Sequence, residues 1–442
     1  MKLRKKQVKP IGLKDVTIID DAKLRKAITA ASLGNAMEWF DFGVYGFVAY
    51  ALGQVFFPGA DPGVQMIAAL ATFSVPFLIR PLGGMFFGTL GDKYGRQKIL
   101  SITIIIMSVS TFCIGLIPSY ASIGIWAPIL LLLAKMAQGF SVGGEYTGAS
   151  IFVAEYSPDR RRGFMGSWLD FGSIAGFVLG AGIVVIISAV IGEESFLDWG
   201  WRVPFILSSA LVLIGLYVRV SLHETPVFAK VAKAGKQVQI PLGTLLSKHM
   251  KATILGTFIM LATYTLFYLM TVYSMTYGTT AQPLGLGYSR NSFLWMLMVA
   301  VIGFGIMVPI AGLLADAFGR RKTMIAITLL MIAFAFVFPG LLGSGNQVLV
   351  MGFLLLGLSI MGLTFGPMGA LLPELFPTEV RYTGASFSYN VSSILGASVA
   401  PYIATWLQAN YGLFYVGVYL AAMAALTLIA LLLTHETKHQ TL

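Results

Sequence analysis

Long stretches of apolar residues, separated by short polar breaks, make up most of the chain. Each stretch is about twenty residues long, the length that a helix needs to cross the hydrocarbon core of a membrane. The pattern therefore predicts an all-α membrane protein with twelve transmembrane helices. We expect these helices at residues 27–52, 66–90, 99–118, 122–147, 164–191, 203–220, 252–277, 292–315, 323–342, 347–372, 383–408 and 411–433.

The longest polar break divides the predicted spans six and six. It covers residues 221–251, contains several lysines and is predicted to be a cytoplasmic linker. The predicted organisation is a cytoplasmic N-terminal segment at 1–26, a six-helix bundle at 27–220, the linker at 221–251, a second six-helix bundle at 252–433 and a cytoplasmic tail at 434–442.

Two motifs recur in both halves. Residues 88–98 read GTLGDKYGRQK, and residues 312–322 read GLLADAFGRRK, 224 positions later. The stretch EYSP at 155–158 corresponds to ELFP at 374–377, 219 positions later. Each pair follows the equivalent span of its half, so the halves are predicted to be parallel repeats, and the two bundles are expected to be pseudo-symmetric.

Composition and charge placement support a membrane protein. The chain is 57% hydrophobic and 11% charged, with a mean hydropathy of +0.81, whereas soluble domains carry about 25% charged residues. The net charge of +11 would suit nucleic acid. However, Lys and Arg gather in the N-terminal segment, alternate breaks and the tail, as the positive-inside rule requires. We therefore expect both termini in the cytoplasm and no nucleic-acid partner, with lipid around the spans and anionic lipid as an alternative contact of the basic N-terminus.

Charged residues inside spans are confined to the first half. Such groups are costly in hydrocarbon, so each should face a partner or an aqueous cavity. Glu38 and Asp41 are three residues apart and share one helix face. Two adjacent carboxylates favour the binding of a proton, although a static ion pair, for instance of Asp41 with Arg80, is the alternative. The residues predicted to couple transport to protons are Glu38, Asp41, Arg80, Glu145 and Asp170.

Aromatic and amide residues accompany these charges. Aromatic faces beside a carboxylate suit a quaternary ammonium group or another zwitterion, while ordinary packing is the alternative. Lys135 either binds a substrate carboxylate, with Glu145 or Asp170 facing the substrate ammonium, or is a counter-ion of one of these acids. The predicted substrate-binding residues are Asn35, Trp39, Tyr45, Lys135, Gln138, Trp168, Tyr264, Tyr268, Tyr389 and Asn390.

The repeated G-x-L-x-D-x-x-G-R-x-K loop resembles the signature loop of the major facilitator superfamily, and the resemblance covers essentially the whole chain. In that superfamily the aspartate joins a cytoplasmic charge latch that stabilises one access state. A turn that only directs membrane topology is the alternative. The latch residues that the resemblance implies are Asp92, Arg96, Glu155, Arg161, Asp316, Arg320, Glu374 and Arg381.

Further stretches resemble the metabolite:proton symporter branch of this superfamily. They are NAMEWFDF at 35–42, QGFSVGGEY at 138–146 and WGWRVPF at 199–205. Residues 1 to about 200 resemble its osmoregulatory proline and glycine-betaine symporters. From about residue 205 the chain resembles an orphan metabolite-transport member related to shikimate and dicarboxylate carriers, through HETPVF at 223–228 and LPELFPTEVR at 372–381. A junction of two parents near Trp199–Pro204 is one hypothesis.

The resemblance implies a monomer in the cytoplasmic (inner) membrane, with a substrate cavity between the halves. Its implied activity is alternating-access proton symport of a small zwitterion such as proline or glycine betaine, with an organic acid or another metabolite as the alternative substrate. Antiporters of the superfamily often carry a Gly-Pro motif in the fifth span, and 164–191 contains no proline, which favours symport. No cofactor, metal site or enzyme activity is expected, because all four histidines lie in loops or the tail.

Overall fold

The computed structural model describes residues 21–59, 62–234 and 241–438, and these form helices and connecting turns. Most of the predicted N-terminal segment, part of the linker and the end of the tail lie outside the described residues. The first half contains α1 (Asp21–Phe56), α2 (Pro62–Tyr94), α3 (Arg96–Leu116), α4 (Tyr120–Ile123), α5 (Trp126–Tyr156), η2 (Asp159–Arg161), α6 (Arg162–Ile191), α7 (Glu193–Ser195), η3 (Phe196–Gly200) and α8 (Arg202–Val220).

The linker carries two short helices, and the second half repeats the pattern of long ones. The linker helices are α9 (Pro226–Lys233) and α10 (Pro241–Lys248). The second half contains α11 (Met250–Tyr268), η4 (Leu269–Tyr273), α12 (Ser274–Thr279), α13 (Arg290–Phe318), α14 (Arg320–Leu342), α15 (Gln347–Glu374), η5 (Thr378–Val380), α16 (Arg381–Ser393), η6 (Ile394–Ser398), α17 (Ala400–Tyr411) and α18 (Leu413–Leu433).

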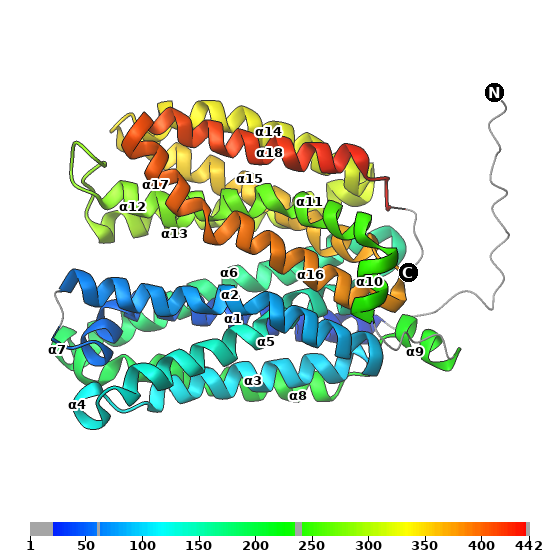
Figure 1. Ribbon diagram of the computed structural model, residues 1–442, viewed down its shortest axis with the longest axis horizontal. Helices are drawn as coiled ribbons and strands as arrows, with labels where there is room; N and C mark the ends of the chain where they lie inside the picture. The colour runs from blue at the N-terminus through cyan, green and yellow to red at the C-terminus, as the bar shows by residue number, and fades with distance from the viewer. Residues whose placement is uncertain (1–20, 60–61, 235–240, 439–442) are drawn as a thin grey trace.

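The long helices form two bundles that lie side by side (Figure 1). In the first bundle α1 packs on α6, α2 on α5, and α3 on α8; in the second, α13 packs on α15, and α14 and α11 pack on α18. The bundles meet where α2 lies against α16 and where α6 lies against α13 and α15. The linker helices lie at one end of both bundles, which we call the linker end (Figure 1).

Eight of the described helices are each long and apolar enough to cross a membrane. The other four expected spans are α1, α2, α8 and the broken pair α16–α17. The predicted span 122–147 was misplaced. Its helix begins at Trp126, because Gly124 breaks the chain with a φ of 61°, and it continues to Tyr156. It is longer than expected because Glu155, which lies beyond the predicted end, is buried against protein partners instead of hydrocarbon.

Two features of the helices shape the interior. Segments of π-helix, η4 and η6, interrupt the seventh and eleventh spans, and such turns occur frequently at functional sites. The first bundle also has a close contact between α1 and α6. A Cβ atom added to Gly176 would lie 1.9 Å from the carbonyl oxygen of Ala36, so only glycine allows this approach. The contact fixes the helix that carries Glu38 and Asp41.

Candidate functional site

A buried ion pair lies where the first bundle faces the second. Glu38 on α1 and Arg80 on α2 approach to 3.1 Å between Oε1 and Nη2, and their side chains are only 12% and 14% exposed. The Arg80 guanidinium also lies 4.4 Å from the ring centroid of Phe77. The alternative pairing of Arg80 with Asp41 is therefore wrong, because Glu38 occupies that position.

Asp41 belongs to a separate buried network. Its Oδ2 accepts hydrogen bonds from Thr111 Oγ1 at 2.6 Å and from Gln138 Nε2 at 2.7 Å. Lys135 donates to Gln138 Oε1 at 2.8 Å, and its ammonium lies 3.9 Å from the ring centroid of Tyr45. The Gln138 side chain thus bridges Lys135 and Asp41. Buried charges need such partners, and Asp41 is the acid that balances Lys135.

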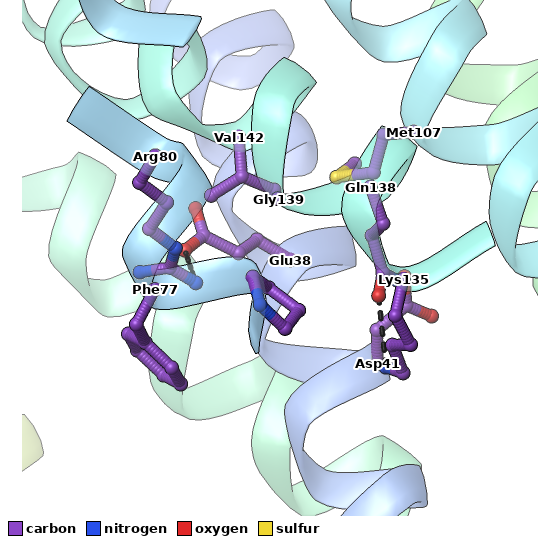
Figure 2. A pocket seen from close by; sticks show the side chains of 10 residues that line it. Glu38, Asp41, Phe77, Arg80, Met107, Lys135, Gln138, Gly139 and Val142 are labelled. Atoms are coloured by element: carbon purple, nitrogen blue, oxygen red, sulfur yellow. Dashed lines mark hydrogen bonds and ion pairs between the residues drawn. The ribbon is translucent and has the colours of Figure 1, made fainter. Parts of the chain in front are cut away.

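A cavity of about 30 Å³ lies between these two charged groups (Figure 2). Glu38, Asp41, Arg80, Lys135 and Gln138 all line it. This volume has room for one or two water molecules, and it is too small for an amino acid. The two charged groups therefore line one common cavity.

Aromatic residues of the second bundle face the Glu38–Arg80 pair. Trp39 meets Phe267 edge to face at 5.2 Å between ring centroids, and Phe77 meets Tyr268 at 6.0 Å. Tyr264 in turn meets Tyr389 edge to face at 5.3 Å between ring centroids. We call Trp39, Phe267, Tyr264, Tyr268 and Tyr389 the aromatic wall. It includes four of the predicted substrate-binding residues.

Asp170 lies behind this wall on α6. It is 1% exposed, and its Oδ1 accepts a hydrogen bond from the Tyr146 hydroxyl at 3.0 Å. Its other oxygen has no hydrogen-bond partner among the described residues. The Tyr146 ring stacks on Tyr389 at 4.5 Å, which connects Asp170 to the aromatic wall. A buried carboxylate with so few partners is costly when ionised.

The structure places several other predicted residues away from the cavity. Asn35 is fully buried and donates to Leu169 O and Ser173 Oγ, so it joins α1 to α6. Asn390 donates to the Gly143 carbonyl at 2.8 Å and holds the bundles together. Trp168 is 40% exposed and packs on Phe164 and Phe171 of its own helix. Trp168 therefore lies on the outward face of α6, which we call its outward stripe. It does not line the cavity, although its position two residues before Asp170 had predicted a substrate-binding role.

Glu145 has a partner that the sequence did not reveal. It forms a buried ion pair with Arg219 at the end of α8 and accepts a hydrogen bond from Thr103 at 2.6 Å. The proposed pairing of Lys135 with Glu145 or Asp170 is therefore wrong. The sequence did not single out Arg219, because it stands at the end of the predicted span 203–220, next to the basic linker; in the structure it is only 2% exposed.

The latch aspartates cap helices of the opposite bundle at the linker end. Asp92 accepts hydrogen bonds from the backbone N–H groups of Tyr382 and Thr383 at 3.1 and 2.8 Å. Asp316 accepts from Gly163 and Phe164, both at 2.8 Å. Both acceptors lie at a helix N-terminus, of α16 and α6 respectively, where a negative charge is stabilised. The repeated motif therefore ties the bundles together twice.

Buried glutamates complete this latch. Glu155 binds Arg96 of its own bundle at 3.5 Å and Arg381 of the other at 2.9 Å. Glu374 likewise binds Arg320 of its own bundle at 3.3 Å and an arginine of the other at 2.9 Å. The latch thus consists of two symmetry-related sets that both cross the interface.

The arginine that reaches Glu374 is Arg162. The predicted latch residue, Arg161, is exposed at the surface. Adjacent residues at a helix start point in directions about 100° apart, so only one of them can face the second bundle. The prediction of Arg161 was therefore wrong by one position.

A third repeated motif supports the latch, and the sequence analysis missed its role. His-Glu-Thr occurs at 223–225 and again at 435–437, after the last span of each half. Glu224 accepts from the N–H of Gln97 at 3.2 Å, and Glu436 accepts from that of Arg320 at 2.7 Å. The following threonines donate to Glu155 and Glu374. The repetition of His-Glu-Thr in both halves is the sequence signal that could have identified these glutamates and threonines.

Gly95→Ala tests the cap that Glu224 provides. Gly95 has a φ of 113°, and a Cβ atom there would lie 2.2 Å from Glu224 Oε2. The variant should lose about 1 kcal/mol to backbone strain and about another 1 kcal/mol because the capping carboxylate is displaced. Thermal unfolding in detergent would measure the loss.

Gly412→Ala is the matched control for that substitution. Gly412 has a φ of 95° and also precedes a helix, but no atom lies within 4 Å of a Cβ built there. Gly412→Ala should therefore lose only the stability that backbone strain costs, about 1 kcal/mol. Equal melting temperatures for the two variants would contradict a stabilising role for the Glu224 contact.

The chain matches two family models, "Sugar (and other) transporter" over residues 26–239 and "Major Facilitator Superfamily" over residues 283–442. The inner membrane metabolite transport protein YhjE of Escherichia coli K12 is 63% identical over 419 residues, 94% of this chain and 95% of that protein. The glycine betaine/proline/ectoine/pipecolic acid transporter OusA of Dickeya dadantii is 56% identical over 458 residues, 100% of this chain and 89% of that protein.

The proline/betaine transporter of Escherichia coli K12 is 54% identical over 450 residues, 100% of this chain and 89% of that protein. Both kinds of relative match nearly the whole chain, so the proposed junction near Trp199–Pro204 stays a prediction. Among solved structures, the proton:xylose symporter XylE bound to 6-bromo-6-deoxy-D-glucose superposes with a TM-score of 0.77 at 15% identity, over 94% of this chain and 97% of that one. That likeness shows the fold.

Proposed function

Because the chain belongs to the major facilitator superfamily, in the branch of its proline/betaine and metabolite transporters, we propose that it carries a small zwitterion such as proline or glycine betaine in symport with protons. The observation that carries this proposal is the shared cavity between two buried charged groups, Glu38–Arg80 and Asp41–Lys135. One group faces the aromatic wall and is suited to a solute; the other lies deeper and is suited to a proton.

The linker end is closed in the described state, and we place that end, with both termini, in the cytoplasm. The latch ion pairs and capped helix ends join the two bundles there. A solute would therefore enter between the bundles from the opposite end, and the latch would have to break before it left. This sequence is alternating access by movement of one bundle against the other.

Solute binding is assigned to the Glu38–Arg80 pair and the aromatic wall. The substrate carboxylate would pair with Arg80, whose guanidinium is the cation beside the wall. The substrate ammonium would then lie between Glu38 and the ring faces of Trp39 and Tyr268, which attract a quaternary ammonium without needing a hydrogen bond. Each substrate charge would replace a protein charge, so neither Glu38 nor Arg80 would be left unpaired.

Proton coupling is assigned first to Asp41. Gln138 links Asp41 to Lys135, so a proton on Asp41 would leave Lys135 without its nearby anion, whereas loss of the proton restores that anion. Asp41 lies three residues from Glu38 on one helix face, so occupancy of either acid alters the field at the other. Asp170, which lacks a counter-ion among the described residues, is the second acid that we propose to carry a proton.

An organic acid is the alternative substrate, since two basic residues, Arg80 and Lys135, line the same cavity. Counterflow in proteoliposomes with labelled glycine betaine, proline and shikimate separates the two classes. Exchange of betaine or proline supports the zwitterion assignment. Exchange of shikimate alone would replace it with the organic-acid assignment, and exchange of none of the three would contradict both.

Trp39→Ala should raise the KM for the substrate about tenfold, because a ring in the aromatic wall contributes up to about 2 kcal/mol to the binding of a desolvated cation. Trp168→Ala is the matched control, since that ring lies on the outward stripe of α6. It should change the KM by less than about twofold. Initial rates of uptake across a substrate range measure both values, and equal effects would contradict the aromatic wall as the binding surface.

A further inference from the structure

An open pocket of about 390 Å³ lies at the linker end, in the seam where α6 meets α13. It is separate from the central cavity and from every group assigned above to solute or proton binding. Its floor is the latch contact in which the Asp316 carboxylate accepts hydrogen bonds from the N–H groups of Gly163 and Phe164. The residues that line it are Arg160, Arg161, Phe164, Leu313, Asp316 and Ala317.

Two cations at this pocket have no protein partner. Arg160 and Arg161 are both exposed, and neither side chain makes a hydrogen bond or ion pair with another described residue. The next residue, Arg162, is buried against Glu374. One arginine of the run thus serves the latch, and two remain available to an anion that approaches the surface.

The other walls of the pocket are apolar. Leu313 is 53% exposed, and Ala317, one turn farther along α13, is also exposed. Both lie at the end of a membrane span, where apolar side chains face acyl chains and basic side chains reach the headgroups. A cationic rim above an apolar wall at this depth matches a phospholipid better than a soluble anion.

The pseudo-equivalent seam on the other side of the molecule is filled by protein. Glu379 and Val380 stand there in place of Arg160 and Arg161, 219 positions later in the chain. Val380 is fully buried, and α9 and α10 pack on its segment, η5. The linker thus covers one seam, while the described part of the chain leaves its counterpart open to the membrane.

We propose that this seam pocket binds the headgroup of an anionic phospholipid. The phosphate pairs with Arg160 and Arg161, and an acyl chain lies along Leu313 and Ala317. The lipid takes the place that the linker helices occupy in the other seam. Because α6 and α13 belong to different bundles, the bound lipid bridges them while the Asp316 contact is intact.

Native mass spectrometry of the purified full chain, titrated with phosphatidylglycerol and with phosphatidylcholine of the same acyl chains, tests this proposal. Phosphatidylglycerol should bind more tightly. Removing both charges in an Arg160→Gln/Arg161→Gln variant should weaken that binding about tenfold or more, because each basic residue near an anionic lipid contributes about a factor of five. A lysine pair, Arg160→Lys/Arg161→Lys, should keep most of the affinity.

The matched control is Lys98→Gln/Lys322→Gln, which removes two exposed charges from the linker end without touching the pocket. Its lipid affinity should stay near that of the unmodified chain. Equal loss in both double variants would show unspecific attraction and overturn the proposal. Release of the lipid by millimolar inorganic phosphate would also overturn it, since the site would then be one for a soluble anion.

Discussion

Asp41→Asn should abolish pH-driven accumulation of the substrate while leaving substrate exchange within about threefold of the unmodified rate. The amide has the shape of the carboxyl group and can still accept a hydrogen bond from Thr111, but it cannot release a proton. A gradient of one pH unit stores about 1.4 kcal/mol per proton, enough for about tenfold accumulation. The variant should therefore reach an accumulation ratio of about one, which labelled uptake into proteoliposomes measures.

Asp170→Asn is the informative comparison for that variant. Asp170 is also buried, but it lies behind the aromatic wall and bonds to Tyr146. If Asp41 couples transport, Asp170→Asn keeps a larger accumulation ratio than Asp41→Asn. Full accumulation by Asp41→Asn together with none by Asp170→Asn would move the coupling site to α6.

Arg162→Gln should open the linker end. It leaves Glu374, which is buried, without its partner from the opposite bundle, and loss of one member of a buried pair typically costs about 3–5 kcal/mol. Part of that loss is offset because Arg320 still pairs with Glu374. The closed state should therefore lose at least about tenfold in population, and transport should slow because the protein rests in the wrong access state.

Cysteine alkylation measures this opening. Thr147 is buried in the interface, where its hydroxyl meets that of Ser386. In a Cys113→Ser background, Thr147→Cys should react slowly with a membrane-impermeant maleimide, and at least about tenfold faster after Arg162→Gln. Lys322→Gln, which removes an exposed charge from the same end, should leave the rate unchanged. No acceleration by Arg162→Gln would contradict the latch.

Much of the fold could be predicted because lipid imposes a simple rule on sequence. Every span needs about twenty apolar residues, so the predicted segments match the helices except where polar residues are buried in protein. Glu155 illustrates the exception, since it is buried in the part of α5 that continues beyond the predicted end at residue 147. The latch aspartates could be predicted because their motif occurs twice at equivalent positions.

The candidate site could be predicted only in part, because helix spacing gives the face of a residue but not its partner. Glu38 and Asp41 share a face, yet Glu38 pairs with Arg80, whereas Asp41 is linked through Gln138 to Lys135. Trp39 follows Glu38 and Trp168 lies two residues before Asp170, but Trp39 belongs to the aromatic wall and Trp168 to the outward stripe of α6. Such differences depend on how helices from distant parts of the chain are rotated against each other.

The central claim is that solute and proton move together through the cavity between Glu38–Arg80 and Asp41–Lys135. Its most direct test is proton flux driven by a substrate gradient alone, in weakly buffered proteoliposomes whose membrane voltage is clamped. Added proline or betaine should make the external medium alkaline as protons enter with the solute, and Asp41→Asn should remove this signal. Entry of labelled substrate at full rate without any pH change would contradict the account.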